Sequence, residues 1–235
     1  MTNIYAVIPA HNESLSIKSV VRATRSAVDL CLVVDDGSLD KTAQSARRAG
    51  AKLIRLAGRT GTANATKVGL QYVIQNGADI VCLLDGDGQH DPRYIPILLT
   101  EIDKGADLVI GSRFIKPTRN STSLFRRLGT RMISFLIWIV YKKRIYDPTS
   151  GFRAMNQRTL KYLVDRYPVI FPEPEVAIDL INHGFVIKEV SVEMRPRMYG
   201  KSSIGLVKAF YLMTYIIQKI LYDWVVNTFK ILFFL

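Results

Sequence analysis

Short apolar runs and amphipathic segments alternate along the first half of the chain. The apolar runs predict β-strands at about residues 4–9, 30–35, 52–56, 79–84 and 108–111. The intervening segments carry apolar residues at helical spacing and predict helices at about residues 14–27, 38–49, 63–76 and 92–104. Repeated β-α units with mostly apolar strands are typical of a parallel, doubly wound sheet, whose ligands bind at the carboxyl ends of the strands. We therefore expect an α/β fold with a cleft at that edge.

Two carboxylates follow the fourth predicted strand, in the sequence Asp85-Gly86-Asp87-Gly88-Gln89. On an extended chain the side chains of Asp85 and Asp87 point the same way, and two like charges held together need a cation to neutralise them. Oxygen ligands suit a hard divalent ion, Mg²⁺ or Mn²⁺, which usually shares its coordination sphere with substrate phosphates. Gln89 offers a further carbonyl oxygen. The motif predicts a metal–diphosphate site, and a polar turn after a strand is the alternative.

Polar residues also follow the first, second and fifth predicted strands. The three groups are Pro9-Ala10-His11-Asn12-Glu13, Asp35-Asp36-Gly37-Ser38 and Gly111-Ser112-Arg113. Each has an ordinary structural explanation, since Glu13 suits a helix N-terminus, Asp36 a turn, and Arg113 a surface ion pair. In a parallel sheet, though, these strand ends meet at one edge. Together with the two carboxylates they predict a single cleft, in which the guanidinium of Arg113 fits a diphosphate.

Charge is distributed unevenly over the 235 residues, whose formal net charge is +12. Residues 1–112 contain 12 Lys and Arg and 12 Asp and Glu, whereas residues 113–235 contain 20 and 8. The positive excess flanks apolar segments, and no helix-turn-helix, zinc-finger or RNA-recognition signature accompanies it. We therefore favour a surface that faces anionic lipid headgroups and phosphates over a nucleic-acid groove.

Two features bear on the compartment. Cys31 and Cys82 both lie in apolar runs, which favours buried free thiols over a disulfide and fits a reducing compartment. The chain enters its first predicted strand without a basic segment or a cleavage signal, so we expect no signal peptide. Both features fit a site of action on the cytoplasmic face of a membrane.

Two apolar segments in the second half predict helices that lie in a membrane interface. The first, at about residues 124–141, has an apolar part only half as long as a spanning helix. In the second, residues 204–235, polar side chains recur every three to four positions and form one stripe on an otherwise apolar helix. Trp138 and Trp224 suit headgroup depth. A buried core helix, an oligomer interface and contact with a small membrane protein are the alternatives for the second segment.

The ordered motifs resemble those of family 2 glycosyltransferases. The matching blocks are residues 8–13, 33–38, 84–92 and 110–114. Two further blocks, residues 147–154 and 195–202, are similar to the polyprenyl-phosphate branch, which includes dolichol-phosphate mannose synthase and bacterial undecaprenyl-phosphate glucosyl- and GlcNAc-transferases. The resemblance covers roughly residues 3–210. It implies an inverting, metal-dependent enzyme with the nucleotide-diphospho-sugar transferase (GT-A-like) fold, with residues 1–203 as catalytic domain and residues 204–235 as an amphipathic juxtamembrane helix.

The resemblance also implies roles for matching residues. The implied metal ligands are Asp85, Asp87 and Gln89. The implied nucleotide-sugar contacts are Pro9, His11, Glu13, Asp36, Asp85, Gly86, Arg197 and Lys201. Arg113 and Arg127 would contact the acceptor phosphate or the donor diphosphate and act in catalysis with Asp87. Glu173 and Glu175 would position sugar hydroxyls or the basic loop, although Glu173 also fits a helix start.

The sequence departs from the family pattern at three places. His11 stands where the family often has Tyr, and Gly61-Thr62-Ala63 replaces a Gly-Lys-Gly, which removes a cation although Arg59 is close by. Ser203 replaces a second lysine. The change at His11 bears on stacking against the base, and the other two bear on individual phosphate contacts. The missing lysine keeps open the alternative of a sugar-nucleotide-binding subunit without catalysis.

Taken together, the residues and the resemblance predict transfer of a sugar from a nucleotide diphosphate to undecaprenyl or another polyprenyl phosphate, for cell-envelope glycan synthesis. The resemblance favours UDP-glucose or UDP-GlcNAc as donor, with GDP-mannose second. A lipid phosphate is already an anionic nucleophile, so the protein needs cationic clamps and a metal ion rather than a general base. Another lipid or glycan acceptor is the enzymatic alternative; nucleic acid is not an expected partner, whereas a second copy of the chain is an open one.

Overall fold

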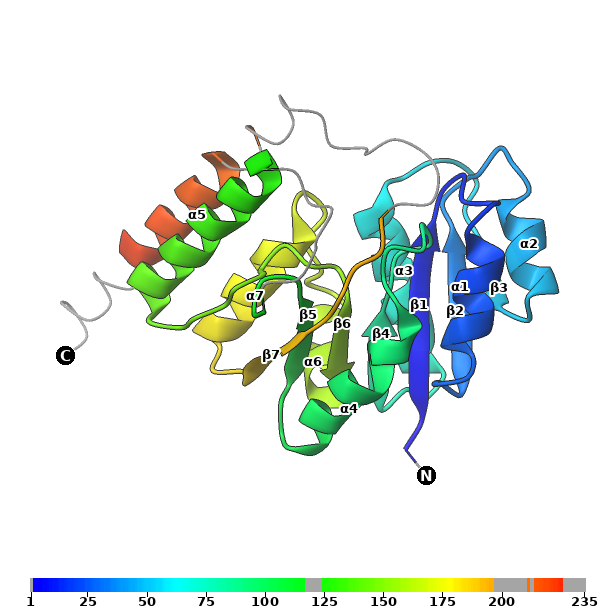
Figure 1. The fold of residues 1–235 in the computed structure, drawn as a ribbon, viewed down its shortest axis with the longest axis horizontal. Helices are drawn as coiled ribbons and strands as arrows, with labels where there is room; N and C mark the ends of the chain where they lie inside the picture. Colours follow the sequence, from blue (N-terminus) through cyan, green and yellow to red (C-terminus); the bar gives the residue numbers. More distant parts are fainter. Residues whose placement is uncertain (1, 117–123, 197–210, 212–213, 226–235) are drawn as a thin grey trace.

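The computed structural model describes residues 2–116, 124–196, 211 and 214–225. Within them, strands form one sheet in the order β3-β2-β1-β4-β6-β5-β7 (Figure 1). The strands are β1 Ile4–Ala10, β2 Leu30–Asp35, β3 Lys52–Arg55, β4 Ile80–Leu83, β5 Leu108–Ser112, β6 Arg153–Asn156 and β7 Ile187–Ser191. β6 pairs antiparallel with β4 and β5, and every other pairing is parallel. The predicted mostly parallel α/β sheet is confirmed.

Helices cover both faces of this sheet. On one face lie α1 Ile17–Thr24, α2 Thr42–Arg48 and, after the short 3-10 turn η1 Pro92–Tyr94, α4 Ile95–Asp103. On the other lie α3 Thr62–Gln75, α6 Gln157–Leu163 and α7 Pro172–Asn182. Alternate residues of β1 supply the two cores, since Ala6 and Ile8 pack with the first group and Val7 with the second. The fold is doubly wound as expected.

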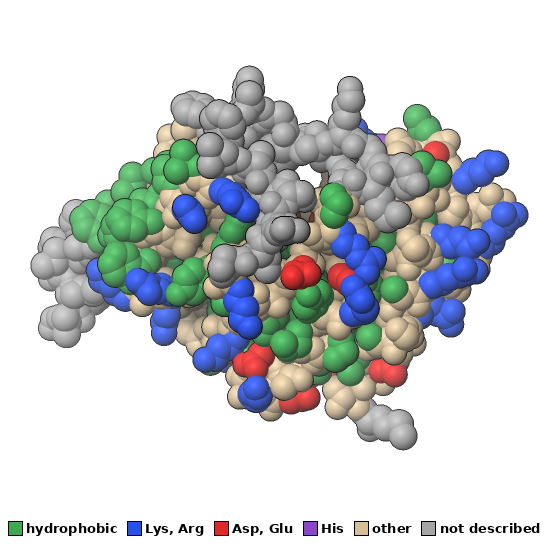
Figure 2. All heavy atoms as spheres, viewed as in Figure 1, with side chains coloured by type: hydrophobic (Ala, Val, Ile, Leu, Met, Phe, Trp, Pro, Cys, Tyr) green, Lys and Arg blue, Asp and Glu red, His purple; other side chains and the backbone are tan. Residues whose placement is uncertain are grey.

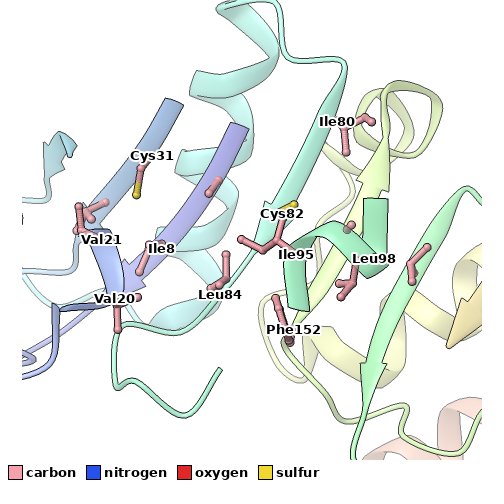
Figure 3. Packing of buried hydrophobic residues seen from close by; sticks show 14 of the residues in the cluster. Ile8, Val20, Val21, Cys31, Ile80, Cys82, Leu84, Ile95, Leu98 and Phe152 are labelled. Carbon is pink, nitrogen blue, oxygen red and sulfur yellow. The ribbon is translucent and has the colours of Figure 1, made fainter. Parts of the chain in front are cut away.

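The first of these cores is dense and apolar. Figure 3 shows Val20 and Val21 of α1 and Ile95 and Leu98 of α4 directed toward side chains of the sheet, among them Cys82. Cys31 and Cys82 are both free and buried, and burial raises the pKa of each thiol to about 12. The prediction of buried free thiols is confirmed.

A third helical layer extends the molecule beyond the sheet. Helix α5 Leu124–Tyr141 and a helical segment at residues 214–225 lie side by side next to α7 (left in Figure 1). Their shared core is formed by Ile133, Ile137, Ile178, Ile216 and Ile220. The predicted helix at residues 124–141 is confirmed, whereas much of the predicted helix at 204–235 lies outside the described residues. Over the described part of the chain, every helix is too short or too polar to cross a membrane.

Hydrogen bonds attach the segment at residues 214–225 to α5 and to α7. The hydroxyl of Tyr141 in α5 donates to Asp223 at 3.2 Å, and the hydroxyl of Tyr215 donates to Glu175 at the start of α7, also at 3.2 Å. Glu175 is 7% exposed and accepts a second hydrogen bond, from the amide of Phe171. This helix is therefore fixed to the element that carries Glu173.

Candidate active site

The loop after β4 places Asp85 and Asp87 at the carboxyl edge of the sheet. The loop turns through Gly88, whose φ of +80° suits glycine, and the amide of Gln89 then donates to Asp87 Oδ1 at 2.9 Å. The Asp87 residue is 4% exposed, whereas the Asp85 side chain is 44% exposed. One carboxylate is therefore held inside the loop while the other opens toward the cleft.

The oxygens of this loop fit a divalent cation that also binds a diphosphate. Among the described residues, no group of three or more His, Cys, Asp or Glu side chains could hold a metal by itself. The carboxylates of Asp85 and Asp87 and the side-chain carbonyl oxygen of Gln89 suit an ion that completes its coordination with phosphate oxygens. The space in front of Asp85 is kept free by Gly151, where a Cβ would lie 3.7 Å from both Asp85 carboxylate oxygens. The residues therefore fit Mg²⁺ or Mn²⁺.

A narrow hollow lies beside Asp85, and we call it the donor hollow after the role that the sequence predicts for Asp85. Its lining includes Pro9, Thr66, Asp85, Arg153, Tyr167 and Glu173. The structure thus brings three of the residues considered from the sequence, Pro9, Asp85 and Glu173, to one place. Thr62 and Ala63 also line it, so neutral side chains occupy the positions where the family pattern has Lys-Gly. The hydroxyl, carboxylate and guanidinium groups of this lining are of the kinds that form hydrogen bonds with the hydroxyl groups of a sugar.

Arg153 is a residue of this hollow that the sequence analysis did not assign. Only 2% of it is exposed, and it donates to the carbonyl oxygens of Ser150 at 2.8 Å, Pro148 at 3.0 Å and Glu173 at 2.6 Å. Burial lowers the pKa of its guanidinium, and nearby acidic groups, Glu173 among them, oppose that shift. It fixes the loop before β6 to the start of α7. The local sequence carries no signal for this role.

The part of the cleft that the sequence predicts to bind the nucleotide is built on the ends of β1 and β2. The Asp36 carboxylate accepts hydrogen bonds from the amide of Thr60 at 2.6 Å, its hydroxyl at 2.8 Å and the amide of Gly61 at 2.8 Å. The carbonyl of Asp36 lies 2.7 Å from Nδ1 of His11. His11 and Asp36 are therefore neighbours, as expected for one pocket, and Asp36 also orders the loop before α3.

Glu13 and Gly86 meet through a third residue. The hydroxyl of Ser16 lies 2.7 Å from the carbonyl oxygen of Gly86 and 3.1 Å from the carboxylate of Glu13. A Cβ at Gly86 would lie 3.0 Å from the Cβ of Ala10, so glycine lets the loop after β4 approach β1 closely. In this arrangement both residues bring the two strand-end loops together.

Arg113 forms a buried ion pair and not the surface pair considered from the sequence. It is 5% exposed, and its Nε and Nη2 donate to the two carboxylate oxygens of the fully buried Asp147 at 2.6 and 2.7 Å. Its Nη2 also donates to Thr149 at 2.9 Å. Asp147 itself is fixed by its amide, which donates to Glu189, a carboxyl group whose pKa burial raises. The pairing partner lies 34 residues away, so no local pattern predicts it.

A second, wider hollow lies between the end of β5 and α5, with a volume of about 710 Å³. We call it the basic pocket. Its cationic lining residues are Arg113, Lys116, Arg127, Arg131 and Arg144, and its aromatic ones are Phe114, Phe135, Trp138 and Tyr146. The guanidinium of Arg144 lies 5.8 Å from the centre of the Trp138 ring. The structure therefore brings Arg113 and Arg127 into one pocket, whereas Arg197 and Lys201 lie outside the described residues.

Comparison with known proteins decides the family. The profile of Glycosyl transferase family 2 matches residues 5–163. The chain is a family 2 glycosyltransferase. The relatives of this glycosyltransferase include UDP-N-acetylglucosamine–dolichyl-phosphate N-acetylglucosaminyltransferase of Methanococcus voltae, 30% identical over 69% of this chain and 73% of the relative. They also include polyprenol monophosphomannose synthase of Mycolicibacterium smegmatis, 29% identical over 85% of this chain and 80% of the relative.

A solved structure confirms the fold of this glycosyltransferase. Glucosyl-3-phosphoglycerate synthase of Mycobacterium tuberculosis, in complex with Mn²⁺, UDP and phosphoglyceric acid, aligns with a TM-score of 0.72 at 22% identity. The alignment covers 95% of this chain and 78% of that one. The predicted family and GT-A-like fold are confirmed, and the individual site residues stay predictions.

Proposed function

We propose that this family 2 glycosyltransferase moves one sugar from a nucleotide diphosphate to a polyprenyl phosphate at the cytoplasmic face of a membrane. The observation that carries the proposal is the basic pocket, which joins a cluster of cations to an exposed apolar helix. It lies one loop away from the donor hollow, because Tyr146 lines the basic pocket and Gly151 the donor hollow. A phosphate bound by the cations would therefore lie close to a donor sugar beside Asp85.

The lining of the basic pocket suits a phosphate that carries an apolar chain. Arginine binds phosphate oxygens through directed pairs of hydrogen bonds. Phe135 and Trp138 are 55% and 43% exposed, and their aromatic surface continues along α5 away from the cations. A soluble phosphate would use the cations alone, whereas an isoprenoid chain would cover the aromatic surface as well. The pocket therefore favours a lipid phosphate.

The outer face of α5 and the neighbouring helical segment suits the surface of a bilayer. Figure 2 shows apolar side chains gathered over these helices. The exposed ones are Leu128, Met132, Phe135, Trp138, Ile139, Leu221, Tyr222, Trp224 and Val225. Arg131 in α5 and residues 142–144, which directly follow α5, add exposed positive charge. Aromatic residues and cations together are typical of interfacial helices.

We place UDP-glucose or UDP-GlcNAc ahead of GDP-mannose. One relative is named for UDP-N-acetylglucosamine, and the solved structure that shares the fold holds UDP. Asp36, which we expect near the base or the ribose, is 3% exposed, and its carboxylate is held by three hydrogen bonds from the loop of Thr60 and Gly61.

The reaction follows from these positions. An oxygen of the lipid phosphate attacks the anomeric carbon, the bond from that carbon to the nucleotide diphosphate breaks, and the configuration inverts. The attacking oxygen is already anionic, so no proton has to be removed. A divalent ion bound by Asp85, Asp87 and Gln89 would neutralise charge on the departing diphosphate. Arg113 and Arg127 would hold the acceptor phosphate and offset its repulsion from the donor.

A transfer assay tests the proposal directly. Purified protein would be incubated with Mn²⁺ or Mg²⁺, undecaprenyl phosphate and a panel of labelled sugar nucleotides, with Asp87→Ala in parallel and Lys104→Ala as a surface control. We expect an organic-extractable labelled lipid from one donor, absent with Asp87→Ala and unchanged with Lys104→Ala. A water-soluble product made from 3-phosphoglycerate would assign another acceptor, and nucleotide binding without any transfer would indicate a non-catalytic subunit.

A further inference from the structure

We propose that His90 is a positioning residue that aims the carboxylate of Asp85 into the donor hollow. This inference rests on the proposed function, because it concerns how the metal–diphosphate loop is held. His90 closes the loop that begins at Asp85, and it contacts that residue at two points. Neither contact can be read from the sequence, in which His90 is one polar residue of a polar loop.

The first contact fixes the tautomer of the neutral imidazole. The backbone amide of Asp85 lies 3.0 Å from Nδ1 of His90. An amide can only donate, so Nδ1 must accept, and in the neutral ring the proton then sits on Nε2. The ring therefore offers an acceptor at one nitrogen and a donor at the other.

The second contact uses that donor. Nε2 of His90 lies 3.7 Å from Oδ2 of Asp85. This separation is longer than a hydrogen bond, so the attraction between the Nε2–H group and the carboxylate is electrostatic. One nitrogen of the His90 ring thus contacts the backbone of Asp85, and the other contacts its side chain. The result is a restraint on the direction of the carboxylate as well as on the position of the loop.

The imidazole is itself held rigidly. It is 4% exposed and stacks on Phe152, with ring centres 5.2 Å apart and planes 15° apart. Phe152 is fully buried and directly precedes β6. Beside it, a Cβ at Gly151 would lie 3.6 Å from the imidazole Cε1 and 3.7 Å from the Asp85 oxygens. Ring and carboxylate therefore border the same side-chain-free space, where a bound ligand has room.

Three variants separate the parts of this arrangement. His90→Phe keeps an aromatic ring for stacking and removes both nitrogens. His90→Asn keeps an acceptor near the amide of Asp85 and removes the donor that faces the carboxylate. His183→Asn is the matched control, because His183 directly follows the C-terminal end of α7 and is bonded to Tyr162 and Asp179. Binding of Mn²⁺ would be measured by electron paramagnetic resonance at saturating UDP, with thermal unfolding of each variant.

We expect His90→Phe to weaken Mn²⁺ binding about tenfold or more. The Mn²⁺ affinity of His90→Asn should lie between those of His90→Phe and the wild type, and that of His183→Asn should equal the wild type. In transfer assays the Mn²⁺ concentration for half-maximal rate should rise, while kcat at saturating Mn²⁺ recovers; a purely structural role would lower kcat at every Mn²⁺ concentration.

Wild-type Mn²⁺ affinity in folded His90→Phe overturns the inference. If that variant fails to fold, wild-type Mn²⁺ affinity in His90→Asn overturns it. A wild-type protein that binds neither UDP nor Mn²⁺ overturns the proposed function as well.

Discussion

The donor hollow and the basic pocket are built in different ways. Around the donor hollow, functional groups sit on strand ends and loops and are fixed by hydrogen bonds to backbone, as Asp36 and Arg153 are. The basic pocket is wide and lined by long side chains of α5, several of them exposed, as Arg131 and Trp138 are. A rigid site suits one nucleotide and one sugar, and an adaptable one suits a flexible lipid. Under the proposed function, we expect donor selectivity to reside in the first and acceptor tolerance in the second.

Asp147 lies between the two hollows, and its loss should have the largest effect. Asp147→Ala would leave the buried guanidinium of Arg113 without its carboxylate, which we expect to lower the free energy of unfolding by about 3–5 kcal/mol. Urea denaturation would measure it. Lys104→Ala, which removes an exposed pair with Glu101, should change it by less than about 1 kcal/mol. Equal effects of the two substitutions would mean that Arg113 does not depend on Asp147.

The basic pocket should act on the acceptor alone. Arg131→Ala removes one exposed cation from it, and we expect the KM for undecaprenyl phosphate to rise about tenfold, the equivalent of one hydrogen bond to a charged group. The KM for the sugar nucleotide should stay unchanged. Arg48→Ala, at the far end of the molecule on α2, serves as control. A shift in the donor KM of Arg131→Ala would contradict the division between the two hollows.

The apolar face of α5 should determine binding to vesicles. Replacing Trp138 by Ala removes a large exposed aromatic side chain, and we expect partitioning onto vesicles containing phosphatidylglycerol to fall about tenfold. Sedimentation with the vesicles would measure this. Leu39→Ser is the control, since Leu39 is 94% exposed but lies after β2, away from α5. If both substitutions weakened binding equally, the membrane contact would not be specific to α5.

The smallest effect is expected at the link between the third helical layer and α7. Tyr215→Phe removes the hydroxyl that donates to Glu175 and should lower the free energy of unfolding by about 1 kcal/mol. The donor KM should shift little, because Glu175 keeps its bond from Phe171. Chemical denaturation and donor titrations would show both. A large change in donor KM would mean that the helix at residues 214–225 controls the donor hollow.

The sequence located elements wherever a local pattern was strong. The five predicted strands match β1 to β5 within a residue or two, because each is an apolar run bounded by polar or glycine residues. The helices between them were predicted in the right places; those at residues 14–27 and 38–49 were predicted too long at both ends, and that at 63–76 lies one residue from α3. β6 and β7, with α6 and α7, were outside the prediction. β6 is four residues long and begins with the buried Arg153, so its place between β4 and β5 depends on partners far along the chain.

What the sequence determined by itself is the family, the parallel sheet and the cluster of polar strand ends, because periodicity, glycines and closely spaced carboxylates are local. Only the tertiary structure decided which groups meet. It paired Arg113 with Asp147, seated Arg153 on three carbonyl oxygens, and set the imidazole of His90 against Asp85. It also joined the cations that follow β5 with those of α5 in one pocket. The burial of a charged side chain, or an ion pair between distant residues, produces no periodic pattern in the sequence. The reason is that the energy of such a contact depends on surroundings that exist only after folding.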